Sequence, residues 1–138
     1  MFNGCKNLKS VKFTSTSGYI DSLAFQSCES LEYVDLGTTT ITEIGESAFQ
    51  ECKFIEKVYS KSTALKTIGY SAFYLCAKLS TASFPECMHI GSYAFAFCSN
   101  LTSISFPSLA AWRISLYCDW LILKLPEELP TLKGNLYL

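Results

Sequence analysis

One repeated unit of sequence limits the fold of this chain more than any other feature. An Ala-Phe pair recurs at Ala24, Ala48, Ala72 and Ala94, so that successive copies lie 24, 24 and 22 residues apart. A cysteine follows each phenylalanine by three residues, and an aliphatic residue follows each cysteine by three. Repetition at a period of about 20 to 50 residues is typical of solenoids, in which each unit buries its apolar face only against its neighbours. The sequence therefore predicts a solenoid.

Each unit contains a short stretch, Leu-x-x-Ile-x-Phe, in which apolar and polar residues alternate. Its copies are residues 8–13, 31–36, 55–60, 79–84 and 101–106. Such alternation is typical of a half-buried strand. A chain that returns to the same strand position in every unit stacks these strands in parallel, about 4.8 Å apart. Pro85 and Pro107 are expected to end two of the strands, because proline donates no ladder hydrogen bond.

A second stretch, Ile-Gly-x-x-Ala-Phe, lies on the opposite side of each unit. It is too short for a stable isolated helix, and we expect one helical turn or a 3₁₀ piece there. The glycines Gly45, Gly69 and Gly91 are expected to allow a sharp entry into this turn. The interior should contain one aromatic row and two aliphatic rows. These rows are Phe25, Phe49, Phe73 and Phe95; Val11, Val34, Val58, Ala82 and Ile104; and Leu8, Leu31, Ile55, Leu79 and Leu101.

The complete unit is clearest at residues 90–107, which read Ile-Gly-x-x-Ala-Phe-x-x-Cys-x-x-Leu-x-x-Ile-x-Phe-Pro. This pattern resembles the BspA-type leucine-rich repeat over residues 2 to about 109. The resemblance implies an α/β fold class: a right-handed leucine-rich-repeat solenoid with a parallel sheet on its concave face and short helical or 3₁₀ turns on its convex side. It also implies a surface protein of bacteria or parasitic protists that adheres to host proteins and cells.

Two regions are expected along the chain. Residues 1–109 hold four to five repeats, and the first is incomplete, because Phe2-Asn3-Gly4-Cys5 already reads as the middle of a unit. We therefore expect a fragment of a longer array. Residues 110–138 keep a Cys-x-x-Leu element at Cys118 but lack the Ile-Gly-x-x-Ala-Phe element. They are either a degenerate last repeat that caps the sheet or an unrelated tail.

The chain has seven cysteines, and five of them occupy one repeat position and should form an interior column. The column members are Cys5, Cys28, Cys52, Cys76 and Cys98. A straight column does not bring four ligands together around a zinc ion, and the sequence has no Cys-x-x-Cys pairs. Disulfides within the column would leave one member over, so buried free thiols are the favoured interpretation. Cys87 and Cys118 lie outside the column, and Cys87 is the candidate for an exposed thiol.

Composition and motifs favour a protein that is not an enzyme. The formal net charge of −1 argues against a nucleic-acid partner, which requires a basic stripe. No apolar run reaches the roughly 20 residues that span a bilayer, so no membrane insertion is expected from this chain. His89 is the single histidine, and neither a nucleophile elbow nor a phosphate-binding glycine loop is present. We expect no catalytic residue, no metal site and no cofactor.

The candidate ligand-binding residues flank the inward aliphatic residue of each strand, because successive side chains of a strand point to opposite faces. They are Ser10, Lys12, Tyr33, Asp35, Lys57, Tyr59, Thr81, Ser83, Ser103 and Ser105. We expect a protein or glycan ligand on this concave face, with Tyr33 and Tyr59 as rigid anchors. A solvent-facing sheet also needs polar, β-forming residues, and these residues meet that demand equally well.

Two further expectations concern partners and location. The first strand, at residues 8–13, should leave an edge that favours edge-to-edge self-association. Family resemblance implies a cell-surface or secreted protein. The alternative is a cytoplasmic scaffold segment without a ligand of its own, and a signal sequence in the full-length gene would distinguish the two.

Overall fold

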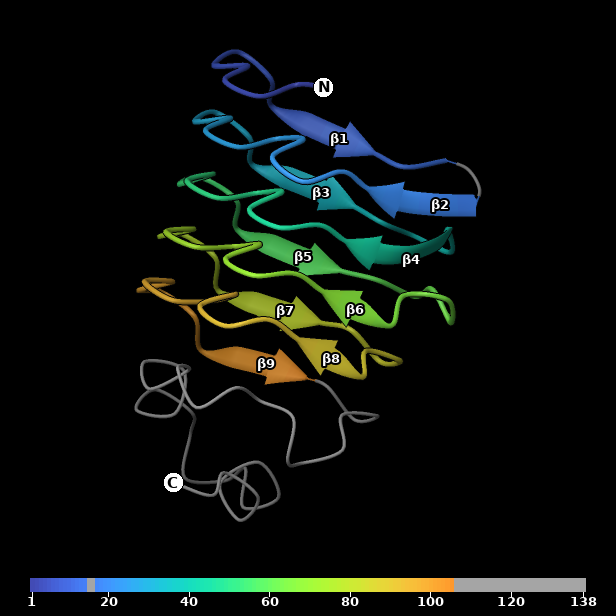
Figure 1. Ribbon diagram of the computed structural model, residues 1–138. Coiled ribbons are helices and arrows are strands. Elements are labelled where there is room, and N and C mark those ends of the chain that lie inside the picture. Colours follow the sequence, from blue (N-terminus) through green and yellow to red (C-terminus); the bar gives the residue numbers. More distant parts are fainter. Residues whose placement is uncertain (15–16, 106–138) are drawn as a thin grey trace.

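The computed structural model describes residues 1–14 and 17–105, and the account of the structure concerns these residues. They form a solenoid in which every unit contributes a strand to one parallel sheet (Figure 1). This sheet has the order β1-β3-β5-β7-β9. Its strands are β1 (Ser10–Lys12), β3 (Tyr33–Asp35), β5 (Lys57–Tyr59), β7 (Thr81–Ser83) and β9 (Ser103–Ser105). The predicted stack of parallel strands is confirmed, and its register aligns Val11, Val34, Val58, Ala82 and Ile104 in one row.

A second parallel sheet was not expected from the sequence. It has the order β2-β4-β6-β8, and in Figure 1 its arrows point opposite to those of the first sheet. Its strands are β2 (Ser17–Ile20), β4 (Thr40–Ile44), β6 (Thr67–Ile68) and β8 (His89–Ile90). Each of these strands ends on the isoleucine that precedes the glycine position. The two sheets enclose the core between them, because the buried isoleucines Ile20, Ile44, Ile68 and Ile90 belong to the same cluster as the valine row.

The expected helical or 3₁₀ turn after the isoleucine was wrong for the residues that the structure describes. The chain there forms consecutive turns in which alternate N–H groups bond outside the unit. Phe49 N donates to Ala72 O of the next unit at 2.8 Å, whereas Cys52 N donates to Phe49 O at 3.2 Å. Ser47 and Glu51 have φ angles of 52° and 61°. A helix requires negative φ and successive bonds within the segment, so stacking between units replaces the helix.

The glycines Gly69 and Gly91 are needed because the backbone of the preceding unit lies close to them, and not because they allow a sharp entry into the turn. A Cβ on Gly91 would lie 2.4 Å from the Tyr70 nitrogen and 2.6 Å from the Gly69 carbonyl carbon. A Cβ on Gly69 would likewise lie 2.7 Å from the Glu46 nitrogen. These distances are too short for any side chain, so glycine lets the turn backbones of successive units touch.

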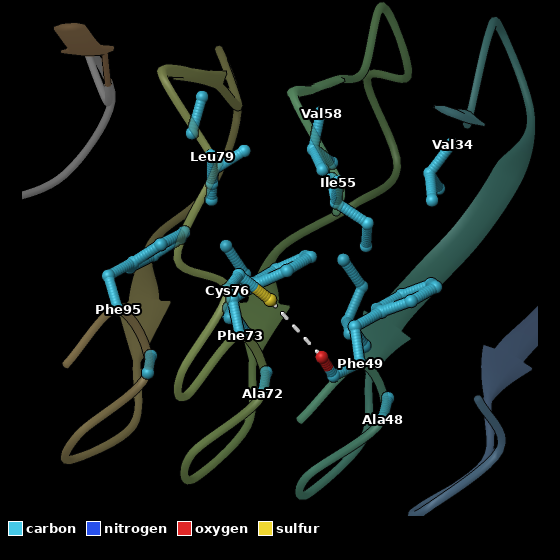
Figure 2. Packing of buried hydrophobic residues seen from close by; sticks show 14 of the residues in the cluster. Val34, Ala48, Phe49, Ile55, Val58, Ala72, Phe73, Cys76, Leu79 and Phe95 are labelled. Atoms are coloured by element: carbon cyan, nitrogen blue, oxygen red, sulfur yellow. Dashed lines mark hydrogen bonds between the residues drawn. The ribbon is translucent and has the colours of Figure 1, made fainter. Parts of the chain in front are cut away.

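The phenylalanine row fills the interior as predicted (Figure 2). Phe49 and Phe73 are fully buried, with ring centroids 5.2 Å apart and ring planes within 4° of parallel. The same stacked arrangement links Phe25 to Phe49 and Phe73 to Phe95. The aliphatic rows are buried too, except at Val11 and Leu8 of the first unit, which are half-buried. Offset stacking of aromatic rings adds to the stability that their burial gives.

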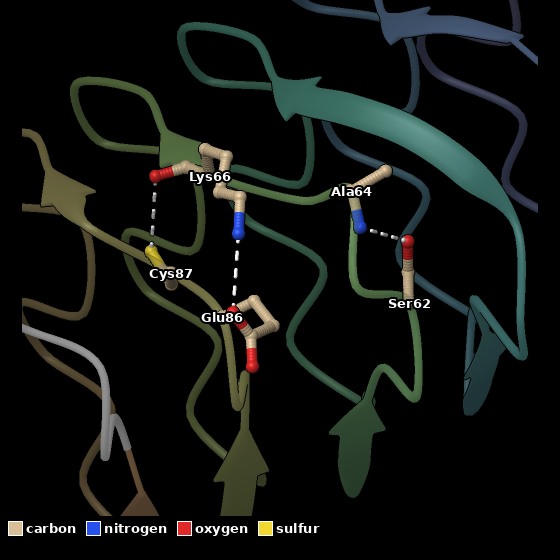
Figure 3. A network of polar contacts seen from close by, with 5 residues as sticks. All are labelled: Ser62, Ala64, Lys66, Glu86 and Cys87. Carbon is tan, nitrogen blue, oxygen red and sulfur yellow. Dashed lines mark hydrogen bonds and ion pairs between the residues drawn. The ribbon is translucent and has the colours of Figure 1, made fainter.

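Cys87 is a buried thiol, so the expectation of an exposed one was wrong. Its side chain has no exposed surface, and its Sγ lies 3.7 Å from Lys66 O and 3.3 Å from His89 O. Figure 3 shows the Lys66 contact beside the ion pair of Lys66 with Glu86, whose charged atoms are 3.1 Å apart. Burial raises the pKa of Cys87 to about 11.

The C-terminal region expected at residues 110–138, with Cys118, lies outside the described residues. Residues 1–14 and 17–105 contain no candidate for a membrane-spanning helix.

Candidate functional site

The structure places the ten candidate residues in two rows along the first sheet. The register aligns one row as Ser10, Tyr33, Lys57, Thr81 and Ser103, and the other as Lys12, Asp35, Tyr59, Ser83 and Ser105. Every one of these side chains is exposed or half-buried, whereas the central residues of β3, β5, β7 and β9 are buried. This alternation puts both rows on the outer face of the sheet. The face is aromatic and charged over β1, β3 and β5 and carries small hydroxyl groups over β7 and β9.

Two tyrosines connect the rows across neighbouring strands. The hydroxyl groups of Tyr33 and Tyr59 lie 3.0 Å apart and share a hydrogen bond. This bond, with smaller effects of desolvation and of the Asp35 charge, raises the pKa of Tyr33 to about 12. Both rings are thereby held in place on a face that is otherwise open to water, with Tyr33 41% exposed. A fixed, amphipathic aromatic pair is a favourable anchor for a ligand, since little rotamer freedom is lost on binding.

The charged residues of the face lie beside this pair. Lys12 Nζ is 4.0 Å from Asp35 Oδ2, and the Lys12 side chain is 72% exposed. Asp35 Oδ1 accepts a hydrogen bond from Gly37 N at 2.8 Å. The Asp35 side chain is only 13% exposed, so the Lys12 ammonium is the charge that remains available to a ligand.

Sequence reasoning missed a groove at the end of this face. The groove has a volume of about 580 Å³ and is open to solvent, and candidate residues Lys12, Asp35 and Tyr59 line it. The rest of its wall comes from Phe13 and Thr14, from residues 37–40, which lead into β4, and from Lys61. Residues 37–40 and Lys61 fall where two units lose the Phe-Pro ending, because Leu36-Gly37 and Ser60-Lys61 stand where the fourth unit has Phe84-Pro85. That departure from the repeat was the signal that could have located the groove.

The cysteine column forms a ladder of hydrogen bonds. The six described cysteines are free thiols, and four column members each donate to the carbonyl of the phenylalanine in the preceding unit. Burial raises the pKa of Cys52 and Cys98 to about 12. A thiol that stays protonated at neutral pH is a poor nucleophile and a poor metal ligand. In the part of the chain that the structure describes, no three His, Cys, Asp or Glu side chains converge on a point that could hold a metal ion.

Comparison with known proteins agrees with this architecture. Residues 1–118 match the BspA type leucine-rich repeat region in six copies. The chain belongs to the BspA-type leucine-rich repeat family. Leucine-rich repeat modules of this kind suggest a role in protein interaction, and the family as a whole is generally not enzymatic.

One solved structure similar to this BspA-type chain is a leucine-rich repeat protein from Bacteroides ovatus ATCC 8483. The two chains are 21% identical, with a TM-score of 0.36, and the match covers 78% of this chain. It covers 40% of the Bacteroides protein, so the chain spans less than half the length of that relative. No curated protein matches the chain.

Proposed function

We propose that this BspA-type chain is a non-enzymatic interaction module that binds a protein or glycan ligand through the outer face of the first sheet. The observation that carries the proposal is the hydrogen-bonded pair of Tyr33 and Tyr59, which sits among Lys12, Asp35 and Lys57. Aromatic anchors beside charged groups are typical of the centre of an interaction surface. Cell-surface or secreted location, and adhesion, belong to the same proposal and are supported by family membership.

The test uses the full chain on an array of immobilised extracellular-matrix proteins and glycans. Tyr33→Ser combined with Lys57→Ser removes one anchor and one charge without changing any residue of the groove. We expect this variant to bind at least about tenfold more weakly, the loss typical of an anchor residue. The matched control is Thr81→Ala with Ser103→Ala, which changes the same row at its hydroxyl-bearing end and should bind as the parent does.

If the folded Tyr33→Ser, Lys57→Ser variant binds with unchanged affinity, the outer face of the first sheet is not the binding site. The next candidate site would be the turns, where the rings of Tyr70 and Tyr93 pack edge to face with their centroids 5.9 Å apart. Failure of the parent chain to bind any array component would favour the alternative of a scaffold segment without a ligand of its own.

We also propose edge-to-edge self-association through β1. Among the described strands, β1 pairs with β3 alone, and a strand edge is a template for another chain. Sedimentation velocity over a hundredfold range of concentration should show association. In a sample held monomeric by dilution, the amide of Val11 should exchange with solvent much faster than that of Val58 in the central strand. Equal exchange rates in a proven monomer would contradict the proposal.

A further inference from the structure

The groove beside β1, β3 and β5 is built by residues that depart from the repeat. Where the fourth unit continues from its strand with Phe84-Pro85, the second unit has Leu36-Gly37 followed by three threonines. Repeat proteins vary mainly at positions that are not needed for stacking, and such loops often carry binding sites. The variable segment of residues 37–40, which ends at the first residue of β4, is therefore a candidate binding element in addition to the sheet face.

Backbone hydrogen bonds hold this loop in one conformation. Gly37 N donates to Asp35 Oδ1 at 2.8 Å, and Lys61 N of the next unit donates to Gly37 O at 2.8 Å. Thr39 N donates to Leu36 O at 3.2 Å, and the Ser62 hydroxyl donates to Thr39 O. A wall that is fixed before binding loses little conformational entropy when a ligand arrives.

One buried polar atom in the groove wall has no partner. Thr39 is only 8% exposed, and its Oγ1 is the single buried side-chain oxygen or nitrogen in the described residues that makes no hydrogen bond. This oxygen has almost no accessible surface, so a ligand in the groove does not reach it. The hydroxyl groups that a ligand can contact are those of Thr38 and Thr40, which are exposed and line the groove.

The charges of the groove favour a ligand that carries an anionic group. Lys12 and Lys61 face one acidic residue, Asp35, whose carboxylate already accepts the Gly37 N–H and lies 4.0 Å from Lys12. Within residues 1–14 and 17–105, the Lys61 ammonium has no ion-pair partner. A carboxylate bound near Lys61 would gain a charge-assisted hydrogen bond, and no ion pair of the Lys61 ammonium within the described residues would have to be broken.

The remaining lining suits a polyhydroxylated ring better than a peptide. The exposed threonine hydroxyls at positions 14, 38 and 40 act both as donors and as acceptors, as sugar hydroxyls do. Tyr59 and Phe13 add aromatic surface against which the apolar face of a sugar ring can pack. The volume of about 580 Å³ lies within the range of small-ligand pockets, roughly 300–1,000 Å³.

We propose that this groove binds a carboxylate-bearing sugar of the hexuronic acid type, free or as part of an acidic glycan, with Lys61 at the carboxylate and Thr38 and Thr40 at ring hydroxyls. The inference rests on the proposed function, because it names a ligand class for the same end of the same face. The two can still fail separately, since Tyr33 and Lys57 lie outside the groove.

The experiment is a titration of the ¹⁵N-labelled full chain, followed through the backbone amide signals. The probes are sodium glucuronate, glucose, sodium acetate and a tri-glutamate peptide. The fifth probe is an acidic glycan that ends in a glucuronate-containing disaccharide. Comparison of its affinity with that of glucuronate distinguishes binding of a free sugar from binding of a glycan terminus. We expect glucuronate to shift the amides of Gly37, Thr39 and Lys61 in a saturable manner, and glucose and acetate each to bind at least about tenfold more weakly.

Two variants and one control sharpen the result. Lys61→Ala should weaken glucuronate binding about five- to tenfold, whereas Lys53→Ala, which removes an exposed positive charge outside the groove, should leave it unchanged. Thr38→Val combined with Thr40→Val keeps the shape of both side chains and removes two exposed hydroxyls of the groove, so it should weaken glucuronate binding without weakening acetate binding.

Several outcomes would overturn the proposal. Equal binding of acetate and glucuronate would mean a simple anion site, and equal binding of glucose would mean that the carboxylate is irrelevant. Tighter binding of the tri-glutamate peptide would mean a peptide groove. Absence of shifts at Gly37, Thr39 and Lys61 with every probe would remove the groove as a sugar site, and the sheet-face proposal would then still stand or fall by its own Tyr33 and Lys57 variant.

Discussion

The thiol of Cys76 donates a hydrogen bond to the backbone carbonyl of Phe49, 27 residues earlier, over an Sγ···O distance of 3.2 Å (Figure 2). The same carbonyl accepts the amide of Cys52 at 3.2 Å. Cys76 therefore completes the hydrogen bonding of a buried carbonyl in the preceding unit. The relationship recurs from Cys52 to Phe25 and from Cys98 to Phe73. Cysteine at this repeat position combines small apolar volume with a weak donor directed at the neighbouring unit.

Substitution of Cys76 by alanine tests this role. Cys76→Ala removes both the donor and the buried sulfur, so we expect the free energy of unfolding to fall by about 1.5–2.5 kcal/mol. The matched control is Cys5→Ala at the half-buried first member of the column, which should cost less than about 0.5 kcal/mol. Chemical denaturation measures both values. Equal losses for the two variants would mean that neither the burial of the Cys76 sulfur nor its hydrogen bond adds measurable stability.

Alkaline pH should destabilise the protein through these thiols. Burial raises the pKa of Cys52 and Cys98 from 9.0 to about 12. The unfolded chain therefore releases protons that the folded chain keeps between about pH 9 and pH 12, and stability falls as the pH rises through this window. Each such thiol adds about 1.4 kcal/mol per pH unit to the slope.

A Cys52→Ala variant isolates the contribution of one thiol. Its stability should fall less steeply above pH 9 than that of the parent, while the slopes at pH 6–8 should agree, because the Cys52 thiol is protonated in both states there. Tyrosine and lysine titrations are common to both proteins and cancel in the difference. Parallel curves up to pH 11 would show that Cys52 is not protected by burial.

The repeat makes the first sheet and the core predictable from the amino-acid sequence. Leu31, Val34 and Phe49 recur at fixed offsets, so each buried row is specified several times over and its register follows from the period alone. A single unit would not contain this information. The thiol column is equally predictable in position, although the carbonyl that each thiol contacts belongs to the backbone and leaves no mark in the sequence.

The second sheet and the turns could not be predicted for a physical reason. The segments Thr40–Ile44, Thr67–Ile68 and His89–Ile90 share little beyond their last isoleucine, and the first has five residues against two in each of the others. Their strand conformation depends on pairing with the neighbouring unit rather than on local propensity. Tyr93 and Phe97 adopt φ angles of 59° each, a region that bulky residues rarely occupy. Contacts between units impose that conformation, and propensity rules do not include them.

The candidate site was predictable only in part. Alternation along the strands located both rows of the outer face, including Tyr33 and Tyr59. The hydrogen bond between these two tyrosines depends on a diagonal contact across strands, which alternation does not specify. The groove depends on Thr39 and Lys61, which occur once each in loops that the repeat does not define.

Truncation of the central phenylalanine should be severe. Phe73 is fully buried and its ring stacks at 5.2 Å on both Phe49 and Phe95. Phe73→Ala should lower the free energy of unfolding by about 3–5 kcal/mol. Phe54→Ala, at a side chain that is 43% exposed, is the control and should cost less than about 1 kcal/mol. A loss below about 1 kcal/mol for Phe73→Ala in chemical denaturation would be incompatible with the stacked row.

The last prediction separates two reasons for glycine in this fold. Gly91 has no special φ angle, yet a Cβ there would lie 2.4 Å from the Tyr70 nitrogen, a backbone atom that no rotamer change can move. Gly4 is the opposite case, with a φ of +70° and nothing within 4 Å of its Cβ position. Gly91→Ala should therefore force two stacked turns apart, at a cost of about 3 kcal/mol or more.

Gly4→Ala should cost only about 1 kcal/mol, the usual strain of a side chain in the left-handed region. Hydrogen exchange gives a second readout, because only Gly91→Ala separates units. It should speed exchange of the amides of Ser71 and Phe73, which donate to Ser92 and Ala94 across the same junction. Equal costs for the two variants, with exchange at Ser71 unchanged, would mean that glycine at this position serves the turn itself and not the contact between units.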